Sequence, residues 1–418
     1  MTNYNISFAS CQTQLVSKSK PKKQKSRYLG EMYVMIGHTS VGGETYLKRA
    51  DRVMQCGDYM KIAVPEAGGA EKIIDANFCR DRLCPMCNWR KSVKIFGQVS
   101  TILKFLKDDF RFIFLTLTVP DVPEQRLNGG LDQLFKSWST LTKRKAFKKA
   151  VKGYFRTLEI TVKYDDDKDI DLYHPHFHVI LAVTKSYFTQ SKVYLNHTKW
   201  TKLWCDCCAA AGVDVPMVKN PKTGEMAPFL SVDVRRIRAR ETAGKTETSE
   251  AAAASEVAKY ALKDDEYLGG ELSDVDRAAR VFFLSQALKG RRLISLGGCF
   301  SKARKALELE DPETGDLSQT DEISDDVWYI VTQFGWHGVG YVAESVERLT
   351  GAQIKQLKAD HAAAMKQGQQ ESAAAQRKRG REAIQKATVL KNERRRASIE
   401  AARHVTYGEL RRRFHHSD

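Results

Sequence analysis

Alternating apolar and polar positions predict four strands in the middle of the chain. The first is the β-branched and aromatic run Phe110–Pro120, which ends at a proline. The other three cover residues 154–164, 174–183 and 229–239. The polar turn Asp165–Asp169 separates the second strand from the third, so these two strands are expected to form an antiparallel hairpin.

Helical spacing of apolar residues frames these strands. It is seen over residues 90–109, over the very basic stretch 131–150 and over residues 255–268. A strand–helix–strand–strand–helix–strand order of this kind is typical of an α+β domain. We therefore predict a central antiparallel β-sheet backed by helices.

Three segments differ in composition from this predicted domain. The basic stretch Lys18–Arg27 contains a proline and predicts a flexible, DNA-facing tail. The segment Glu241–Ser255, rich in Thr, Ala, Gly, Ser and Glu, predicts a mobile connector. The C-terminal segment 351–418 holds 16 Lys and Arg against 7 Asp and Glu, and predicts a helical extension that tracks DNA or binds a partner. The alternative for this extension is a solvated surface helix without a dedicated role.

These changes of composition along the chain predict a division into five parts. They are a basic N-terminal arm (1–50), a cysteine-rich segment (51–100), a catalytic domain (101–300), an accessory segment (301–350) and the basic helical extension (351–418).

The net charge of the 418-residue chain is +17, which predicts an anionic partner, either nucleic acid or an acidic membrane surface. The chain contains no apolar run of roughly 18 residues, and Met1–Leu15 lacks the apolar core of a signal peptide. We therefore expect a soluble, cytoplasmic protein that binds nucleic acid and no membrane.

Nine cysteines in a chain without an export signal argue against a disulfide framework. Cys79, Cys84 and Cys87 follow a C-x4-C-x2-C pattern, and two thiolates on one tight turn suit a metal ion. A closed zinc site needs four ligands, and Cys56 is the best nearby fourth; the alternative is a set of ordinary buried cysteines. We interpret a second group on one predicted helix as core residues: Cys205, Cys207 and Cys208.

Three histidines alternate along the third predicted strand. Because successive side chains of a strand point to opposite faces, His174, His176 and His178 share one face and apolar residues occupy the other. Residues two apart on a strand are separated by about 7 Å, so two imidazoles can converge on one divalent ion. We predict that His176 and His178 are ligands, and that His174 hydrogen-bonds a neighbouring group or the DNA.

A third ligand follows from the geometry of the hairpin. A turn centred between residues 167 and 168 places Glu159 directly opposite His176 and on the same face of the sheet. Two imidazoles and one carboxylate form a site that suits Mn²⁺ or Mg²⁺ acting on phosphate oxygens.

The predicted helix after the connector carries a candidate nucleophile. Glu256 lies four residues before Tyr260 and Lys263 three residues after it, so the three side chains share one helix face. The usual pKa of tyrosine is about 10, so attack on phosphorus requires a nearby cation or a metal-polarised phosphate. Glu256 is placed to act as a general base. The alternative is an ordinary amphipathic helix, and Tyr267 is the next tyrosine to consider.

Three segments in chain order, FLTLTVP, HPHFHVILAV and EVAKYALKDD, resemble the three motifs of HUH endonucleases. They are most similar to plasmid rolling-circle replication initiators with a single catalytic tyrosine, and CRDRLCPMCNWRK resembles a cysteine segment of that group. The resemblance covers roughly Cys56–Leu268. It implies an RRM-like sheet in which His176 and His178 bind the metal, Tyr260 attacks and Glu256 activates water to end the cycle.

The resemblance also implies a reaction and its partners. Site- and strand-specific nicking of origin DNA would leave a 5′-phosphotyrosyl link and a 3′-OH primer, and strand rejoining would end the cycle. Such DNA is expected to be single-stranded or extruded as a hairpin at the nick, with host helicase and polymerase as further partners. The basic residues expected to hold its phosphates are Lys143, Arg144, Lys145, Lys148, Lys149, Arg235 and Arg236.

Three other functions compete with this interpretation. An HUH transposase or conjugative relaxase would use the same chemistry. A histidine-triad nucleotide hydrolase also fits the alternating histidines, but the basic charge and Pro175 count against it. A non-catalytic, zinc-containing DNA-binding protein would leave Tyr260 without a chemical role.

Overall fold

The computed structural model describes residues 13–39, 43–165, 167–168, 170–219, 224–237, 240–242, 245–247, 249–258, 263–319, 322–360, 363 and 393. The chain divides into two compact units. The first unit comprises Met1–Ile323 and Val327–Leu349, and the second comprises Ser324–Asp326 and Thr350–Asp418.

Helices account for most of the first unit outside its sheets. In chain order they are α1 (Gln14–Gly37), α2 (Gly43–Met54), α3 (Pro85–Leu106), α4 (Leu127–Lys143), α5 (Lys145–Ala150), α6 (His197–Ala211), α7 (Ser249–Ala258), α8 (Asp265–Leu268), α9 (Asp274–Leu288) and α10 (Cys299–Ala306), with a short 3₁₀ turn, η2, at Glu124–Arg126.

The strands are short except for one long hairpin. They are β1 (Tyr59–Pro65), β2 (Lys72–Ala76), β3 (Phe110–Thr118), β4 (Val122–Pro123), β5 (Val151–Asp165), β6 (Ile170–Thr184), β7 (Met217–Lys219), β8 (Met226–Pro228), β9 (Val232–Arg236), β10 (Arg240–Thr242), β11 (Lys245–Glu247), β12 (Ile294–Gly298), β13 (Trp328–Trp336) and β14 (Tyr341–Thr350).

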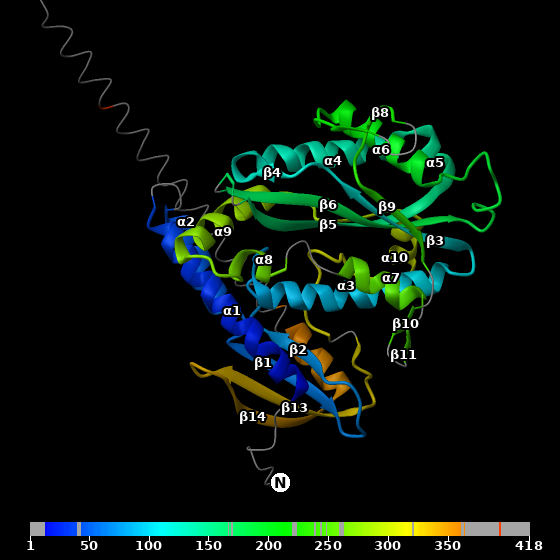
Figure 1. Cartoon of the computed structure of the whole chain (residues 1–418). Helices are drawn as coiled ribbons and strands as arrows, with labels where there is room; N and C mark the ends of the chain where they lie inside the picture. Colours follow the sequence, from blue (N-terminus) through cyan, green and yellow to red (C-terminus); the bar gives the residue numbers. More distant parts are fainter. Residues whose placement is uncertain are drawn as a thin grey trace, which may run out of the picture. The chain divides into compact units, whose positions relative to one another are not determined.

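The central sheet contains all four strands expected from the sequence. Its order is β12-β5-β6-β3-β9, with β4 also paired to β6, and neighbouring strands are antiparallel. Helices lie on both of its faces (Figure 1). The predicted α+β class with an antiparallel sheet backed by helices is therefore confirmed.

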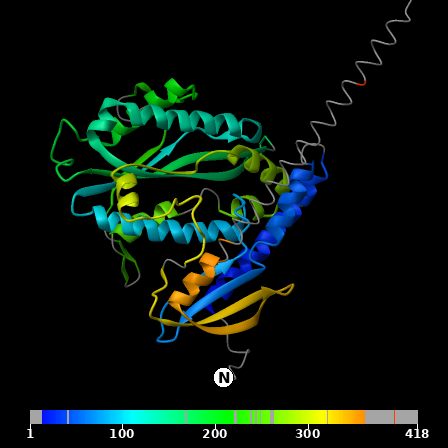
Figure 2. The ribbon, with the colours of Figure 1, turned by 180° about the vertical axis from the view of Figure 1, so that it is seen from behind.

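The two faces of the central sheet meet different helices. Helices α4 and α6 lie over one face, whereas α3 and α7 lie along the other (Figures 1 and 2). On the first face, the ring of Phe177 packs edge-on against Phe135 and Trp138 of α4, with centroids 5.3 and 6.0 Å apart. Side chains alternate along a strand, so His176 and His178 point to the face of α3 and α7.

A second sheet joins segments from both ends of the first unit. Its order is β14-β13-β1-β2, so β1, which follows α2, pairs with β2 on one side and with the distant strand β13 on the other. A small apolar core that contains Met60, Ile62, Ile73 and Phe334 supports it. This sheet is a long-range arrangement that the sequence pattern did not predict.

The basic stretch Lys18–Arg27 lies within α1, so the prediction of a flexible tail is wrong. The Lys23 side chain is fully buried. Its ammonium donates to the carbonyl oxygens of Met54 and Cys56 at 2.5 and 3.1 Å, and it pairs with Asp58 at 2.5 Å. These partners offset the cost of removing a positive charge from water. Part of the positive charge of this segment therefore stabilises the fold.

The described residues of the predicted connector Glu241–Ser255 belong to regular elements, contrary to the expectation of a mobile segment. The short strands β10 and β11 pair with each other, and α7 begins at Ser249. The predicted helix over 255–268 therefore begins earlier than expected: α7 is described over Ser249–Ala258, residues 259–262 lie outside the described part of the chain, and α8 covers Asp265–Leu268. The low complexity of this stretch hid these elements, because alanine-rich and polar residues give no clear apolar period.

The described part of the second unit consists mainly of a helix over residues 351–360, with the short segment Ser324–Asp326 beside it in the same unit. Asp325 accepts a hydrogen bond from the Ala352 amide at 3.1 Å and pairs with Lys355 at 2.6 Å. This helix agrees with the predicted helical extension, most of which lies outside the described residues. Among the helices that the structure describes, none has the length and apolarity needed to cross a membrane.

The buried lysine yields a stability test. We expect Lys23→Met to lower the free energy of unfolding by about 3 kcal/mol, because two carbonyl oxygens and a carboxylate lose their donor. Lys20→Met, an exposed position on the same helix, is the matched control and should change little. Urea unfolding of both variants measures the difference, and equal stabilities would contradict the structural role of Lys23.

Candidate functional site

The β5–β6 hairpin has the register that the sequence predicted. Asp165 pairs with Ile170, and Glu159 therefore pairs with His176. His178 lies opposite Thr157 on β5 and opposite Thr116 on β3. The predicted placement of Glu159 beside the two histidines is confirmed.

Three donor atoms converge at the middle of this hairpin. The Nε2 atoms of His176 and His178 are 3.2 Å apart, and Oε2 of Glu159 lies 3.6 Å from the first and 2.7 Å from the second. Ligands at right angles around an ion with bonds of 2.0–2.1 Å are about 3 Å apart. The spacing of the three donors thus fits a single divalent ion of the size of Mg²⁺ or Mn²⁺.

Neighbouring groups orient both imidazoles for this task. Nδ1 of His176 donates to the carbonyl oxygen of His174 at 3.1 Å, and Nδ1 of His178 lies 3.3 Å from the hydroxyl of Thr116. A proton on each Nδ1 leaves the Nε2 lone pair free for a metal ion. The backbone and β3 therefore set the orientation in which both rings offer Nε2.

The environment keeps the Glu159 carboxylate charged. Glu159 is only 4% exposed, and burial by itself would raise its pKa. Hydrogen bonds and charge interactions with His176 and His178 outweigh burial and hold the pKa of Glu159 well below its usual value. Its second oxygen, Oε1, lies 3.4 Å from the ammonium of Lys263.

His174 stands at the edge of this group. Its Nδ1 lies 2.5 Å from a carboxylate oxygen of Asp121, and its ring is 5.3 Å from that of His176. Its partner is thus a neighbouring side chain, one of the two outcomes expected from the sequence. The donor cluster of Glu159, His176 and His178 does not include it.

Four cysteines form a second donor cluster. The sulfur atoms of Cys56, Cys79, Cys84 and Cys87 all lie within 4.8 Å of one another. The Cys87 sulfur is 3.6 Å from that of Cys56 and 3.7 Å from that of Cys79. Four thiolates at 2.3 Å from a tetrahedral zinc ion have edges of about 3.8 Å. The predicted grouping, with Cys56 as the fourth member, is confirmed, and its geometry fits zinc.

Backbone amides surround the four sulfurs. The amides of Arg80 and Asp81 approach the sulfurs of Cys87 and Cys79 at 3.2 and 3.4 Å, and Arg80 adopts the left-handed conformation with φ 57°. This tight turn brings the donors to sulfur, and it is strained for a residue with a Cβ. Burial alone would raise the pKa of the Cys84 thiol. Hydrogen bonds with the other three cysteines and with Ser26 outweigh burial and hold this pKa well below its usual value, so the thiolate is favoured.

The tyrosine motif is described only in part. Tyr260 lies outside the described residues, as does the side chain of Glu256, whose backbone belongs to α7. Lys263 is described and contacts Glu159. Tyr267 is fully buried, its hydroxyl donates to the carbonyl oxygen of Leu83, and burial raises its pKa well above the usual value. These properties make Tyr267 unsuitable as a nucleophile.

The predicted DNA-binding residues fall into two groups. Glu159, His176 and His178 form the metal-donor cluster of the hairpin. Arg235 lies on its face of the sheet, because the guanidinium stacks on Phe114, which in turn packs against His178. Arg236 points to the opposite face, where it stacks on Phe188. The other five are exposed on α4, on α5 and between them, in the helical layer of that opposite face: Lys143, Arg144, Lys145, Lys148 and Lys149.

The three clustered cysteines of α6 are buried, as expected for core residues. Their sulfurs form no donor cluster in the described part of the chain.

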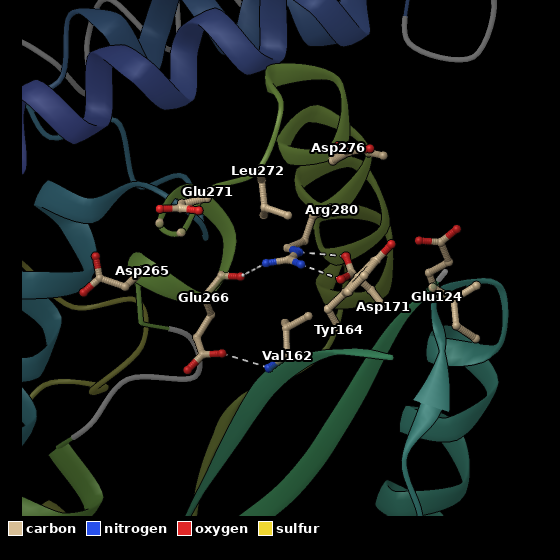
Figure 3. A pocket seen from close by; sticks show the side chains of 14 residues that line it. Glu124, Val162, Tyr164, Asp171, Asp265, Glu266, Glu271, Leu272, Asp276 and Arg280 are labelled. Atoms are coloured by element: carbon tan, nitrogen blue, oxygen red, sulfur yellow. Dashed lines mark hydrogen bonds and ion pairs between the residues drawn. The ribbon is translucent and has the colours of Figure 1, made fainter. Parts of the chain in front are cut away.

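An acidic pocket, which the sequence did not predict, lies beside the tip of the hairpin. Figure 3 shows Arg280 within it, where its guanidinium pairs with Asp171 and donates to the carbonyl oxygen of Glu266 at 2.9 Å. Six carboxylates line the pocket: Glu124, Asp171, Asp265, Glu266, Glu271 and Asp276. Their charge disfavours the binding of DNA phosphates on this side. These carboxylates are spread over about 150 residues of sequence, from Glu124 to Asp276, so no local sequence pattern predicts that they gather in one pocket.

The fold and the two donor clusters define an α+β protein with two candidate metal sites. Residues 70–342 match the family described as Replication protein. This match covers more than half of the chain and includes both histidine and tyrosine motifs. The chain belongs to this family, and the predicted resemblance to plasmid rolling-circle replication initiators is confirmed.

Individual relatives support the same assignment. "Protein rep" of Bacillus amyloliquefaciens is 33% identical over 316 residues, which cover 73% of this chain and 86% of that protein. "Protein rep" of Lactiplantibacillus plantarum is 35% identical over 274 residues, or 65% of this chain and 78% of the relative. A Staphylococcus aureus "Replication protein" is 28% identical, covering 56% and 91%. No solved structure matches the chain.

The cysteine cluster makes a metal-content prediction. We expect the purified protein to retain about one zinc ion per chain, because four thiolates close the site. Cys87→Ser should lose this zinc and lower the melting temperature, whereas Cys205→Ser, a buried cysteine outside the cluster, should retain it. Elemental analysis after dialysis against a weak chelator distinguishes the two, and zinc loss in neither variant would contradict the site.

The hairpin cluster makes a separate prediction. We expect Mn²⁺ to bind with an affinity that falls at least about tenfold in His176→Ala, because one of three protein ligands is lost. His337→Ala, an exposed histidine outside the cluster, should bind Mn²⁺ like the unaltered protein. Titration of free Mn²⁺ by electron paramagnetic resonance measures both, and equal affinities would rule out His176 as a ligand.

Proposed function

We propose that this replication protein starts rolling-circle replication as a metal-dependent, site- and strand-specific DNA endonuclease with Tyr260 as its nucleophile. The observation that carries the proposal is the 3.4 Å contact between Lys263 and Glu159. It joins the tyrosine motif to the metal-donor cluster of the hairpin. Tyr260 precedes Lys263 by three residues, a stretch of chain that spans at most about 11 Å.

The donor cluster suits a phosphoryl-transfer site. A Mn²⁺ or Mg²⁺ ion held by His176, His178 and Glu159 would polarise the scissile phosphate as a Lewis acid. The three ligands are pre-arranged by the hairpin register, so little reorganisation is needed when the DNA binds. Lys263 adds a positive charge beside Glu159, which favours both the phosphate and a phenolate nearby.

The proposed reaction exchanges one phosphodiester bond for another. The phenol oxygen of Tyr260 bonds to phosphorus, the bond from phosphorus to the 3′ oxygen breaks, and the released oxygen takes up a proton. Glu256 accepts the phenol proton, directly or through water. The products are a 5′-phosphotyrosyl link and a free 3′-OH that serves as the primer.

The end of the cycle uses the same groups. After one round of synthesis, a second cleavage and rejoining release a single-stranded circle. Glu256, four residues before Tyr260, then activates a water molecule that ends the cycle. Host helicase and polymerase are the expected partners of the intervening synthesis.

The distribution of charge suggests how the DNA lies. Arg235 shares the face of the metal-donor cluster, lies 3.2 Å from the carboxylate of Asp233, and would contact the cleaved strand together with Lys263. The strand must be single-stranded or extruded as a hairpin, because a helix-borne tyrosine has to reach its phosphate. The basic residues Lys143–Lys149 lie over the opposite face and would hold flanking DNA through its phosphates.

The proposed function also assigns a role to each successive part of the chain. The antiparallel sheet with two histidines on a central strand supports an HUH, RRM-like catalytic domain over residues 101–300. The segment 51–100 would be a structural zinc module, followed by the accessory segment 301–350 and the basic extension 351–418. The replication family favours an initiator over an HUH transposase or relaxase, which share the chemistry.

The nucleophile can be tested directly with origin DNA. We expect the protein, with Mn²⁺ and a 3′-labelled single-stranded origin oligonucleotide, to form an adduct that survives denaturing electrophoresis. Tyr260→Phe should abolish the adduct because it lacks the attacking oxygen, and Tyr194→Phe, an exposed tyrosine, should leave it intact. His176→Ala should also lose it. An undiminished adduct in Tyr260→Phe would assign the nucleophile to another residue.

A further inference from the structure

The end of the tyrosine motif and the three residues after it form an anchor segment, Lys263–Leu268, held to β5 at two points. Lys263 contacts Glu159 at 3.4 Å. Three residues further along the same strand, the Val162 amide donates to Oε2 of Glu266 at 2.8 Å, as Figure 3 shows. The anchor segment therefore follows the strand that carries a proposed metal ligand.

Helix α1 holds the anchor segment from another side. The ammonium groups of Lys22 and Lys25 lie 3.1 and 3.0 Å from the Asp264 carboxylate, and Lys25 lies 2.6 Å from Asp265. The Asp264 side chain is 13% exposed, so these pairs are partly shielded from water. Burial would raise the pKa of Asp264, but hydrogen bonds from Lys25 and Lys22 lower it, which keeps the carboxylate charged.

The cysteine cluster meets both α1 and the anchor segment. The buried hydroxyl of Tyr267 donates to the carbonyl oxygen of Leu83, the residue before Cys84. The Cys84 sulfur lies 3.3 Å from the hydroxyl of Ser26 on α1. One turn of α1, from Lys22 to Ser26, thus contacts both the sulfur cluster and the anchor segment.

We propose that Lys22 and Lys25 are positioning residues for cleavage: with the cysteine cluster as a rigid base, they hold the anchor segment so that Tyr260 is registered against the metal-donor cluster. The inference rests on the function proposed above. Tyr260 is separated from Lys263 by only two residues, so a shift of the anchor segment shifts the nucleophile. A misplacement of 1 Å can reduce a rate about 100-fold.

The same two lysines could be read as contacts to DNA phosphates, and the structure argues against that role. Both ammonium groups are already paired with Asp264 or Asp265, which lie beside the acidic pocket. A phosphate would have to displace these carboxylates. The pairing within the protein therefore favours positioning over DNA binding.

The test compares the Lys22→Met/Lys25→Met variant with the matched control Lys18→Met/Lys20→Met, two exposed lysines of the same helix. With 3′-labelled origin DNA and Mn²⁺, the first variant should form the adduct about 10- to 100-fold more slowly. Its Kd for single-stranded DNA and its zinc content should stay within about twofold of the unaltered protein. The control should match the unaltered protein in all three.

A charge reversal separates positioning from a general loss of charge. Asp264→Lys/Asp265→Lys should slow adduct formation, and adding Lys22→Glu/Lys25→Glu should recover most of the rate, because the pairs reform with opposite sign. Contacts of these lysines to DNA would instead weaken DNA binding and lower its salt dependence, with no recovery in the reversed variant. That result would overturn the proposal.

Hydrogen–deuterium exchange supplies a readout that does not depend on cleavage. Amides of the anchor segment should exchange faster in Lys22→Met/Lys25→Met than in the control, while those of β5 and β6 keep their protection. Unchanged exchange would overturn the proposal. If the unaltered protein forms no adduct, the proposed function fails, and exchange alone still decides whether α1 holds the anchor segment.

Discussion

The register of the β5–β6 hairpin is the constraint on which the rest of the site depends. Pairing Glu159 with His176 places one carboxylate and two imidazoles on one face, and the apolar residues around Phe177 on the other. A slip of one residue would exchange these faces, bury the histidines against α4 and expose the aromatic core. Packing of the core and assembly of the donor cluster are therefore enforced by the same hydrogen bonds.

Buried and half-buried charges connect this sheet to the N-terminal part of the chain. Lys23 ties α1 to the loop that carries Cys56, and Lys22 and Lys25 tie it to the anchor segment. A lysine that gives up water needs specific acceptors, so such contacts fix geometry as well as add stability. These three lysines of α1 thus pair with groups of the protein itself, although the whole chain is strongly basic.

The remaining charge is distributed unevenly around the first unit. Basic residues of α4 and α5 lie over one face of the sheet, Arg235 lies on the face of the metal-donor cluster, and carboxylates gather beside the hairpin tip. The basic residues of α4 and α5 and Arg235 attract a polyanion, whereas the carboxylates beside the hairpin tip repel it. The net charge of +17 describes none of this, because the direction of approach depends on where the charges lie.

The sequence by itself determined four strands of the central sheet, the hairpin register and the two donor clusters, because these follow from alternation, turn position and short spacing along the chain. Even the pairing of Glu159 with His176 was local enough to predict. Only the tertiary structure decided that α1 is packed rather than free, and that β1 pairs with β13, a strand more than 250 residues further along the chain. Those arrangements depend on contacts between residues far apart in the chain, and neither apolar periodicity nor a local motif indicates which distant residue a given residue contacts.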